Sequence, residues 1–315
     1  MTAALCGPAA AQTARAGGAA QERTDAQWLQ AIQSAAQRLN YSGTIVYQRG
    51  AEVRASRIVH AVDGGVVYER LSLLDGRPLE FIRRADEVQC LIPDARRIIV
   101  EHRRGGDAFP ALTNTSPAEI LHYYGLKVGG AGRVAELDCQ MLQLEPRDAF
   151  RYGYRFCVDV GSGLLLKSQT LDERRQVIEQ ITFTEVRIGE PTDPARLKPS
   201  WPIDGWQVEH SDARPTDLAR AGWTIVVPDG FRAMTAVSRR IAGRPAVQAI
   251  YSDGLATFSV FIESRPTVGA ESARTHGPLN AVTRRVGDTL VTVVGEVPAA
   301  TVRGVAAAVT PRTAQ

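Results

Sequence analysis

Apolar residues recur at helical spacing in three stretches of the chain, residues 24–40, 115–125 and 298–309. The first stretch opens with Thr24 or Asp25, either of which suits the N-cap of an amphipathic helix. Its repeating apolar positions are Trp28, Leu29, Ile32, Ala35, Ala36 and Leu39. The other two stretches carry a proline at or near the first turn, so each predicts a short helix.

Most of the remaining chain alternates apolar and polar residues, which predicts β-strands. Such runs follow one another over residues 42–102 and again over residues 132–189, separated by turn pairs such as Asp75-Gly76. Many consecutive strands with few helices indicate an α+β fold. We therefore expect a large, curved antiparallel β-sheet, a half-barrel whose concave face is covered by the first helix.

The same patterns divide the chain into four segments. Residues 1–22 are rich in small residues and read either as the tail of an export signal or as a disordered leader. Residues 23–190 hold the large sheet, and residues 191–205, with four prolines, read as a linker. Residues 206–315 predict a smaller α+β domain with its own antiparallel sheet.

One hairpin in the second domain has a strong local signal. In "AVQAIYSDGLATFSVFIE", residues 246–263, the pair Asp253-Gly254 separates two runs rich in β-branched and aromatic residues. This pair favours a two-residue type I′ turn. That turn would place Tyr251 opposite Ala256 and Ala249 opposite Phe258.

Composition and charge narrow the function classes. With 44% hydrophobic and 23% charged residues the chain reads as a globular protein, and its net charge is only +3. No run of 18 apolar residues is present, so we expect no transmembrane helix. Six Arg-Arg pairs are scattered along the chain and do not form the basic stripe that nucleic-acid binding requires.

The sequence contains no motif that is typical of an enzyme active site. "GSG" at 161–163 reads as a hairpin turn, and the glycine-rich stretch 125–133 matches no phosphate-binding loop. His60 lies in a strand pattern, where a half-buried structural histidine is the simpler interpretation. We therefore expect a binding protein with no cofactor, although a hydrolase site assembled only in three dimensions stays open.

Cysteine spacing bears on the compartment. Cys139 and Cys157 fall on two arms of a predicted hairpin, opposite each other if its turn centres near Asp148. A cross-strand disulfide would suit an exported protein, and two buried small side chains are the alternative. No metal site is expected, because the sequence holds no C-x-x-C motif and its five histidines are dispersed.

Several segments, in order, resemble the RseB/MucB family of periplasmic regulators of the extracytoplasmic-stress sigma factor. The resemblance spans about residues 25–309 and rests on "LNYSGTIVYQRG", "LDGRPLEFIR", "EPRDAFRYGYRFCVDVGSGLLLKSQTLDE", "YSDGLATFSVFIE" and "RRVGDTLVTVVGEVPAAT". Cys157 departs from the family pattern, because the family usually has a bulky aromatic residue there.

The resemblance implies a large domain similar to the lipoprotein carriers LolA and LolB, followed by a smaller C-terminal domain. It implies a periplasmic protein that binds the periplasmic segment of a membrane anti-sigma factor, RseA-like or MucA-like. Binding would shield that segment from the first regulatory protease and restrain the envelope-stress response, and lipid or lipopolysaccharide fragments would release it. The alternative is a lipid or lipoprotein carrier of the LolA/LolB type.

Two sets of side chains are candidates for these roles. The lipid-cavity candidates are Trp28, Ile32, Ile45, Tyr47, Ile58, Val67, Leu71 and Phe81, although these residues could simply pack under the first helix. The partner-binding candidates are Tyr251, Phe258, Phe261, Arg284 and Arg285, since aromatic and arginine side chains are common interface anchors. The sequence leaves both a monomer and a homo-oligomer open.

Overall fold

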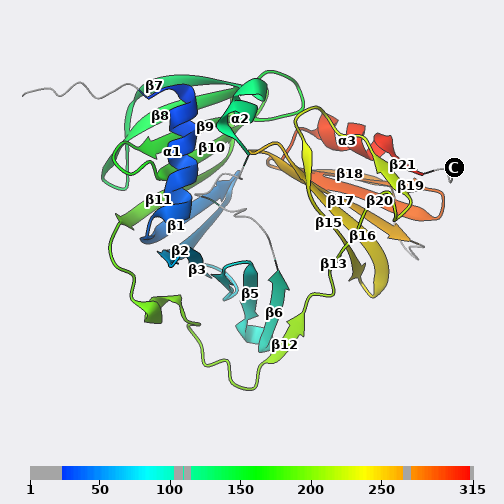
Figure 1. Cartoon of the computed structure of the whole chain (residues 1–315), viewed down its shortest axis with the longest axis horizontal. Coiled ribbons are helices and arrows are strands. Elements are labelled where there is room, and N and C mark those ends of the chain that lie inside the picture. Colours follow the sequence, from blue (N-terminus) through cyan, green and yellow to red (C-terminus); the bar gives the residue numbers. More distant parts are fainter. Residues whose placement is uncertain (1–22, 103–108, 110–114, 265–270, 313–315) are drawn as a thin grey trace, which may run out of the picture.

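Two β-sheets, joined by a long connection, make up most of the molecule (Figure 1). The computed structural model describes residues 23–102, 109, 115–264 and 271–312. The expected leader over residues 1–22 lies outside the described residues. The expected α+β architecture, a large open sheet with helices plus a smaller antiparallel domain, is confirmed.

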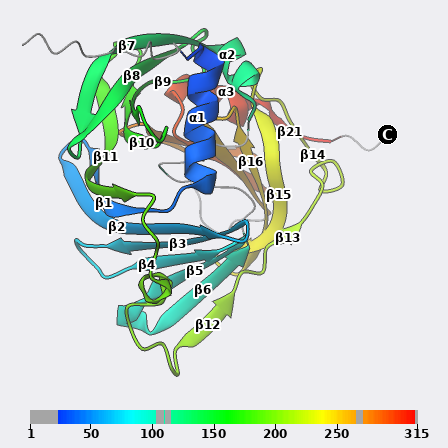
Figure 2. The same ribbon diagram turned by 60° about the vertical axis from the view of Figure 1, so that its left-hand side comes forward.

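The first sheet has twelve strands in the order β12-β6-β5-β4-β3-β2-β1-β11-β10-β9-β8-β7. Its bounds are β1 (Tyr41–Arg49), β2 (Glu52–Asp63), β3 (Val66–Leu73), β4 (Glu80–Arg84), β5 (Glu87–Ile92), β6 (Arg97–His102), β7 (Tyr124–Val134), β8 (Leu137–Pro146), β9 (Gly153–Asp159), β10 (Leu165–Leu171), β11 (Val177–Ile188) and β12 (Gln207–His210). Figure 2 shows how this sheet curves around helix α1.

Helix α1 (Asp25–Arg38) covers the concave face over β7–β11, as its apolar spacing predicts. Thr24 is the N-cap, and its side chain and that of Gln27 form a capping box. Trp28 and Ile32 pack with strand residues such as Phe156, so the helix and the sheet share one apolar core. Helix α2 (Pro117–Tyr123) begins after its N-cap Ser116 and leads directly into β7.

The glycine-rich stretch 125–133 is part of edge strand β7, not a loop. The chain reverses at Ala135-Glu136, and both residues have positive φ angles, 48° and 66°. The turn divides the start of the alternating stretch 132–189 between β7 and β8. Neither alanine nor glutamate is a usual turn residue with positive φ, so no local pattern marks this hairpin.

The second sheet has seven strands in the order β13-β15-β16-β17-β20-β19-β18, and helix α3 (Ala299–Ala308) packs against its β19 and β20 strands. Its bounds are β13 (Arg214–Pro215), β15 (Arg232–Ile241), β16 (Arg244–Ser252), β17 (Thr257–Ser264), β18 (Ser272–His276), β19 (Leu279–Val286) and β20 (Thr289–Gly295). A small separate pair joins β14 (Trp223–Ile225) to β21 (Val309–Pro311).

The proline-rich segment 191–205 is attached to the first sheet over much of its length. The fully buried carboxylate of Glu80 accepts hydrogen bonds from the backbone N–H of Ser200 at 3.0 Å and from its hydroxyl at 2.8 Å. Ile203 and Trp206 pack against the cluster around Leu91. Strand β12 then pairs in parallel with β6, so residues 207–210 belong to the first sheet, and not to the second domain as the expected boundary at 205–206 placed them.

Replacing Glu80 by alanine is expected to release this segment. The substitution leaves the Ser200 amide without its acceptor, which costs about 1–3 kcal/mol of local stability. Trypsin cleavage after Arg196 should then be roughly 10-fold faster, because cleavage follows the population of the opened segment. Glu209→Ala, at an exposed ion pair with Arg97, is the control. Equal cleavage rates in both variants would show that Glu80 does not hold the segment.

The predicted hairpin forms, but its register differs from the expectation by two residues. Tyr251 pairs with Phe258 and Ala249 with Val260, so four residues, 253–256, form the loop. Gly254 has a positive φ of 107°, whereas Asp253 does not have the positive φ that a type I′ turn needs. Instead, the Asp253 carboxylate accepts the backbone N–H groups of Leu255 and Ala256, which stabilises the longer loop. A shift of two residues keeps every side chain on its predicted face.

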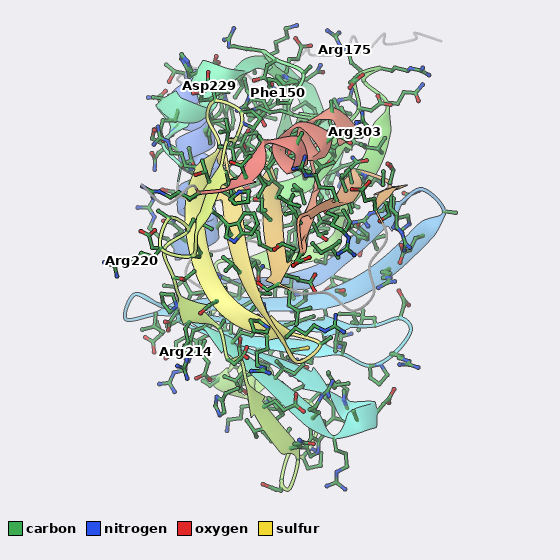
Figure 3. The ribbon with its side chains drawn as sticks, turned by 90° about the vertical axis from the view of Figure 1, so that its right-hand side faces the viewer. Phe150, Arg175, Arg214, Arg220, Asp229 and Arg303 are labelled. Carbon is green, nitrogen blue, oxygen red and sulfur yellow. A yellow bond between two sulfur atoms is a disulfide. The ribbon has the colours of Figure 1, made fainter. Side chains whose placement is uncertain are left out.

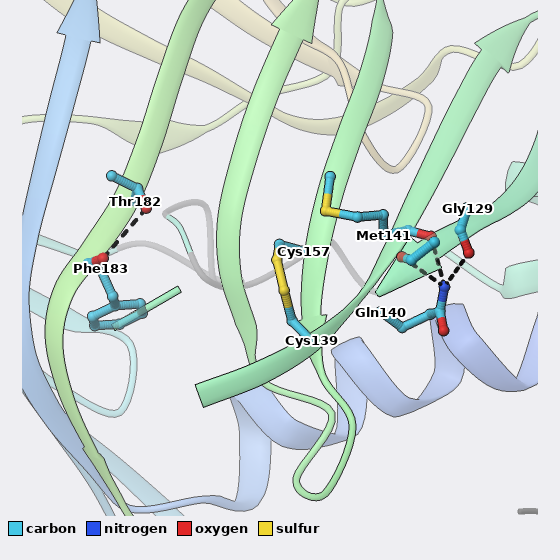
Figure 4. Close-up of a disulfide and its surroundings, with 8 residues drawn as sticks. Gly129, Cys139, Gln140, Met141, Cys157, Thr182 and Phe183 are labelled. Carbon is cyan, nitrogen blue, oxygen red and sulfur yellow. Dashed lines mark hydrogen bonds between the residues drawn. A yellow bond between two sulfur atoms is a disulfide. The ribbon is translucent and has the colours of Figure 1, made fainter. Parts of the chain in front are cut away.

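Cys139 and Cys157 form a disulfide between β8 and β9, with their Cα atoms 5.4 Å apart (Figure 4). The two residues are not directly opposite, because Cys157 pairs with Met141 and Cys139 with Asp159. The turn between these strands therefore centres one residue beyond the expected position, near residue 149. The disulfide joins two diagonally related positions on the neighbouring strands. Both cysteines are buried in the same apolar cluster as Phe183.

Candidate functional site

The six lipid-cavity candidates in strands share one face of the first sheet. Strand register places Ile58, Leu71 and Phe81 directly beside one another across β2, β3 and β4. The remaining three strand candidates are Ile45, Tyr47 and Val67, and pairing through β1 and β2 puts them on this same face. Alternation along each strand thus brings these six side chains to one face of the sheet.

Burial divides the eight lipid-cavity candidates into two groups. Four are buried core residues, namely Trp28, Ile32, Ile45 and Ile58. Four are only partly buried, namely Tyr47, Val67, Leu71 and Phe81. For the first group, packing under α1 and against the neighbouring strands accounts for the apolar side chains without a ligand.

A half-open hollow of about 770 Å³ lies at the strand ends beside this face. Its apolar walls include Leu73, the last residue of β3, and Leu79, which directly precedes β4. Its other lining residues are Val53, Arg54, Asp75, Gly76, Arg77, Ile92, Asp94 and Ala95. None of the eight lipid-cavity candidates lines this hollow. Its apolar residues Leu73 and Leu79 lie two residues from the candidates Leu71 and Phe81, so the hollow is beside the predicted cavity.

A buried histidine lies in the same face as the lipid-cavity candidates. The His60 ring stacks on Tyr41 with centroids 4.5 Å apart, and its Nδ1 lies 3.0 Å from the Leu39 carbonyl oxygen. Burial lowers the pKa of His60 to about 4. Burial also raises the pKa of the neighbouring Glu69 carboxyl, while Arg83 opposes that rise. His60 is therefore a neutral structural residue at pH 7, as its strand position suggested.

Arg151 joins the two domains from the loop between β8 and β9. Its Nε donates to Asp253 Oδ2 at 2.6 Å, its Nη1 donates to Asp148, and its Nη2 donates to the Asp229 backbone carbonyl. The side chains of Arg151 and Asp253 are both fully buried. Figure 3 shows Asp229 and Phe150 at this end of the molecule. A buried ion pair between the two domains therefore forms at the tip of the β16–β17 hairpin.

Arg49 forms a second contact between the domains. Its Nη2 lies 3.1 Å from Glu179 of the first domain and 3.5 Å from Glu296 of the second, and its Nη1 lies 3.4 Å from His276 Nδ1. Burial and the nearby Glu179 carboxylate raise the pKa of Glu296 to about 7, although 49% of that side chain stays exposed. The Arg49 guanidinium thus forms ion pairs with two carboxylates, one from each domain.

The partner-binding candidates fall in different surroundings. Tyr251 and Phe258 are core residues of the second domain, so their burial leaves no surface for a partner, which corrects the expectation for these two. Arg284 donates to the carbonyl of Ala307 in α3. The two remaining candidates, Phe261 and Arg285, are half-buried and exposed respectively, and register places them on the sheet face opposite α3.

Sequence reasoning missed the residues that join the domains. Arg151 lies 102 residues from Asp253, and Arg49 lies 130 residues from Glu179, so no spacing rule points to these pairs. The sequence placed Asp253 in a turn, but it did not indicate that the Asp253 carboxylate is buried. In the part of the chain that the structure describes, no cluster of three or more metal-ligating side chains occurs.

Comparisons with known proteins cover both domains. Residues 24–201 match the MucB/RseB N-terminal domain, and residues 217–310 match the MucB/RseB C-terminal domain. The chain belongs to the MucB/RseB family. It is 32% identical over 295 residues to the sigma factor AlgU regulatory protein MucB of Pseudomonas aeruginosa, covering 91% of each chain. It is 25% identical over 292 residues to the sigma-E factor regulatory protein RseB of Escherichia coli, covering 88% of each.

Solved structures of MucB share the arrangement of both domains. The crystal structure of MucB in complex with MucA(peri) has a TM-score of 0.73 and 30% identity, covering 92% of this chain and 100% of that chain. The Pseudomonas aeruginosa MucA/MucB complex has a TM-score of 0.74 and 30% identity, covering 92% and 99%. MucB/RseB relatives are thus regulatory proteins of sigma factors. Among the described residues, no helix has the length and hydropathy needed to cross a membrane.

Proposed function

We propose that this chain binds the periplasmic segment of a MucA-like or RseA-like anti-sigma factor and so restrains a sigma-factor response. The observation that carries the proposal is the likeness, over both domains, to MucB bound to the periplasmic part of MucA. The TM-scores of 0.73 and 0.74 extend over 92% of this chain, so the likeness includes both domains.

The proposal includes a periplasmic location and no chemical reaction. A buried cross-strand disulfide supports the location, because such bonds persist in oxidising compartments. The contacts between the domains include ion pairs, hydrogen bonds and the stacking of the Arg151 guanidinium on the Tyr123 and Phe231 rings, and none of them requires a reaction. Within this proposal, shielding the bound segment from a regulatory protease is the means by which the response is restrained.

Co-purification tests the proposed partner. The periplasmic segment of a MucA-like anti-sigma factor from the same genome, immobilised through its N-terminus, should retain the full chain at micromolar concentration. A segment of the same composition in scrambled order is the control. Equal retention on both columns, or none on either, would overturn the proposed function.

A lipid amphiphile is the second proposed ligand, and it would lower the affinity for the partner segment. The hollow of about 770 Å³ supports this, because Leu73, Leu79 and Ile92 offer apolar walls while Arg54 and Arg77 offer charges for an anionic headgroup. The carrier alternative is favoured instead if delipidated protein delivers lipid to vesicles and does not bind the anti-sigma segment.

Saturating lysophosphatidylglycerol is expected to weaken the partner segment's affinity. A coupling free energy of about 1–3 kcal/mol corresponds to roughly a 5- to 150-fold rise in Kd. Fluorescence anisotropy of a labelled segment measures this change. Leu79→Asp, which puts a charge into the wall of the hollow, should abolish the lipid effect and leave the lipid-free affinity unchanged. An unchanged Kd in the parent chain at saturating lipid would contradict the coupling.

A further inference from the structure

The Cys139–Cys157 disulfide lies in an apolar cluster of the first domain. Both cysteines are 1% exposed, and they share this cluster with Leu164, Leu166 and Phe183. Thiols and reductants therefore reach the two sulfur atoms only when this part of the sheet opens. The redox state of the pair is thus set while the chain folds and is kept in the folded chain.

A third strand closes the site over the sulfur atoms. Gly132 of edge strand β7 pairs with Cys139, and a Cβ added at Gly132 would lie 3.2 Å from Cys139 Sγ and 3.3 Å from Cys157 Sγ. Met141 Sδ would lie 3.1 Å from the same Cβ. Met141 also pairs directly with Cys157 across β8 and β9, and Figure 4 shows its side chain beside the disulfide. The β7 backbone and a methionine side chain thus pack against the two sulfur atoms.

Two thiols need more room here than one disulfide, because sulfur atoms that are not bonded stay further apart than bonded ones. A close-packed interior supplies such room only by moving its neighbours, and overpacking of this kind destabilises the folded state. The neighbours are the β7 backbone at Gly132 and the Met141 side chain. Reduction would therefore remove the cross-link and also crowd the site.

The segment that the disulfide closes carries contacts to the second domain. The two cysteines are 18 residues apart in sequence, and Arg151 and Tyr152 lie between them. Arg151 pairs with the buried Asp253 carboxylate, and the Tyr152 hydroxyl accepts a hydrogen bond from Asn280 at 2.9 Å. Closing this loop restricts the unfolded chain, so the disulfide favours the folded hairpin on which the second domain docks.

We propose that Cys139 and Cys157 form a redox-sensitive switch, in which the dithiol form is destabilised by crowding as well as by the missing cross-link. A thiol–disulfide oxidoreductase that carries a disulfide closes the switch by exchange during folding. The S–S bond forms in this chain while the S–S bond of the oxidoreductase breaks, and two electrons and two protons pass to the oxidoreductase, which leaves as a dithiol.

The switch makes the amount of competent protein depend on the oxidising capacity of the compartment. Chains that fold without the disulfide are less stable, so fewer of them hold the anti-sigma segment and the sigma-factor response is restrained less. This consequence rests on the proposed function, whereas the relative stability of the two redox forms does not.

Thermal unfolding of matched forms of the full chain tests the switch. Cys6 and Cys90 are replaced by serine in every protein, so that Cys139 and Cys157 are the only cysteines left. The protein is unfolded and reduced, then refolded either in a glutathione redox buffer or with a phosphine reductant present throughout. Alkylation followed by mass spectrometry counts the thiols, and circular dichroism gives the melting temperature (Tm) of each form.

Cys139→Ala/Cys157→Ala separates a switch from a simple cross-link. This variant lacks the cross-link and the thiols, so its Tm should lie about 6–12 °C below that of the disulfide form. The reduced dithiol form should melt at least about 3 °C lower again, because its thiols crowd the site. A simple cross-link predicts the reverse order, since thiols fill the core better than alanine.

The order of the three melting temperatures decides the matter. A reduced chain that does not refold, in a buffer where the alanine variant does, supports the switch equally. An alanine variant that is no more stable than the reduced chain, or that fails to fold together with it, overturns the switch. Equal Tm values for the disulfide and reduced forms overturn it as well.

A variant that makes room beside the sulfur atoms gives a second test. Met141→Ala should narrow the Tm difference between the disulfide and reduced forms by at least about 3 °C, because it relieves the crowding of the thiols. Met234→Ala, which removes an exposed methionine of the second domain, is the matched control and should leave the difference unchanged. An unchanged difference in Met141→Ala would overturn the crowding that the switch requires.

Retention on the immobilised anti-sigma segment is measured separately on the same forms. Redox forms that melt in the predicted order, but are not retained in either state, support the switch and overturn the proposed function alone. Forms that are retained by the segment, but melt at the same temperature, support the proposed function and overturn the switch alone.

Discussion

Replacing Arg151 alone by methionine is expected to destabilise the chain by about 3–5 kcal/mol, because it leaves the fully buried Asp253 carboxylate without its cation. The Tyr124 hydroxyl and two backbone N–H groups would remain as partners of Asp253, and they do not supply a positive charge. Urea unfolding followed by tryptophan fluorescence measures the loss.

Two further variants make this expectation specific. Arg151→Met/Asp253→Asn should be more stable than Arg151→Met, since it removes the uncompensated charge together with its partner. Arg232→Met, which breaks an exposed pair with Glu119, should cost less than about 1 kcal/mol. A loss of less than 1 kcal/mol for Arg151→Met, or a double variant less stable than the single one, would refute the role of the buried pair.

The second large effect is a loss of stability in mild acid that depends on His60. The pKa of His60 is about 4 in the folded chain and about 6.5 in an unfolded one. Above pH 6.5 both states hold a neutral ring, so its contribution to stability is complete. As the pH falls from 6.5 towards 4, the unfolded state gains a proton that the folded state does not, and stability falls.

The expected difference between pH 7.5 and pH 4.5 is about 2–3 kcal/mol from His60 alone. His60→Gln keeps a polar side chain that does not titrate. Between pH 7.5 and pH 4.5 the free energy of unfolding of this variant should therefore fall by about 2–3 kcal/mol less than that of the parent chain. Carboxylates such as Glu296 titrate in both proteins and cancel in the comparison. Parallel pH profiles for the parent and His60→Gln would contradict a buried, neutral His60.

Local pattern was enough to predict the helices and most strands. The N-cap Thr24, the apolar face of α1 and the proline at the start of α2 act within one or two turns, so the sequence signals them directly. The shared face of the lipid-cavity candidates followed equally from alternation, because a strand has a period of two.

Features that depend on distant residues were not predictable in this way. The hairpin loop is longer than its Asp-Gly pair suggested, and the Asp253 side chain that stabilises it also has a partner 102 residues away. Proline content suggested a free linker at 191–205, whereas the buried carboxylate of Glu80, hydrogen bonds from Arg70 and the packing of Ile203 attach that segment to the sheet. The aromatic partner candidates Tyr251 and Phe258 are core residues, since aromatic residues serve cores and interfaces alike.

Isothermal titration of the periplasmic segment of a MucA-like anti-sigma factor into the full chain tests the proposed binding most directly. We predict a saturable binding isotherm with a Kd of about 1 μM or tighter, which corresponds to about 8 kcal/mol of binding free energy. A titration that shows no binding with the segment at about 100 μM, in a chain that is folded by its unfolding curve, would contradict the proposed function.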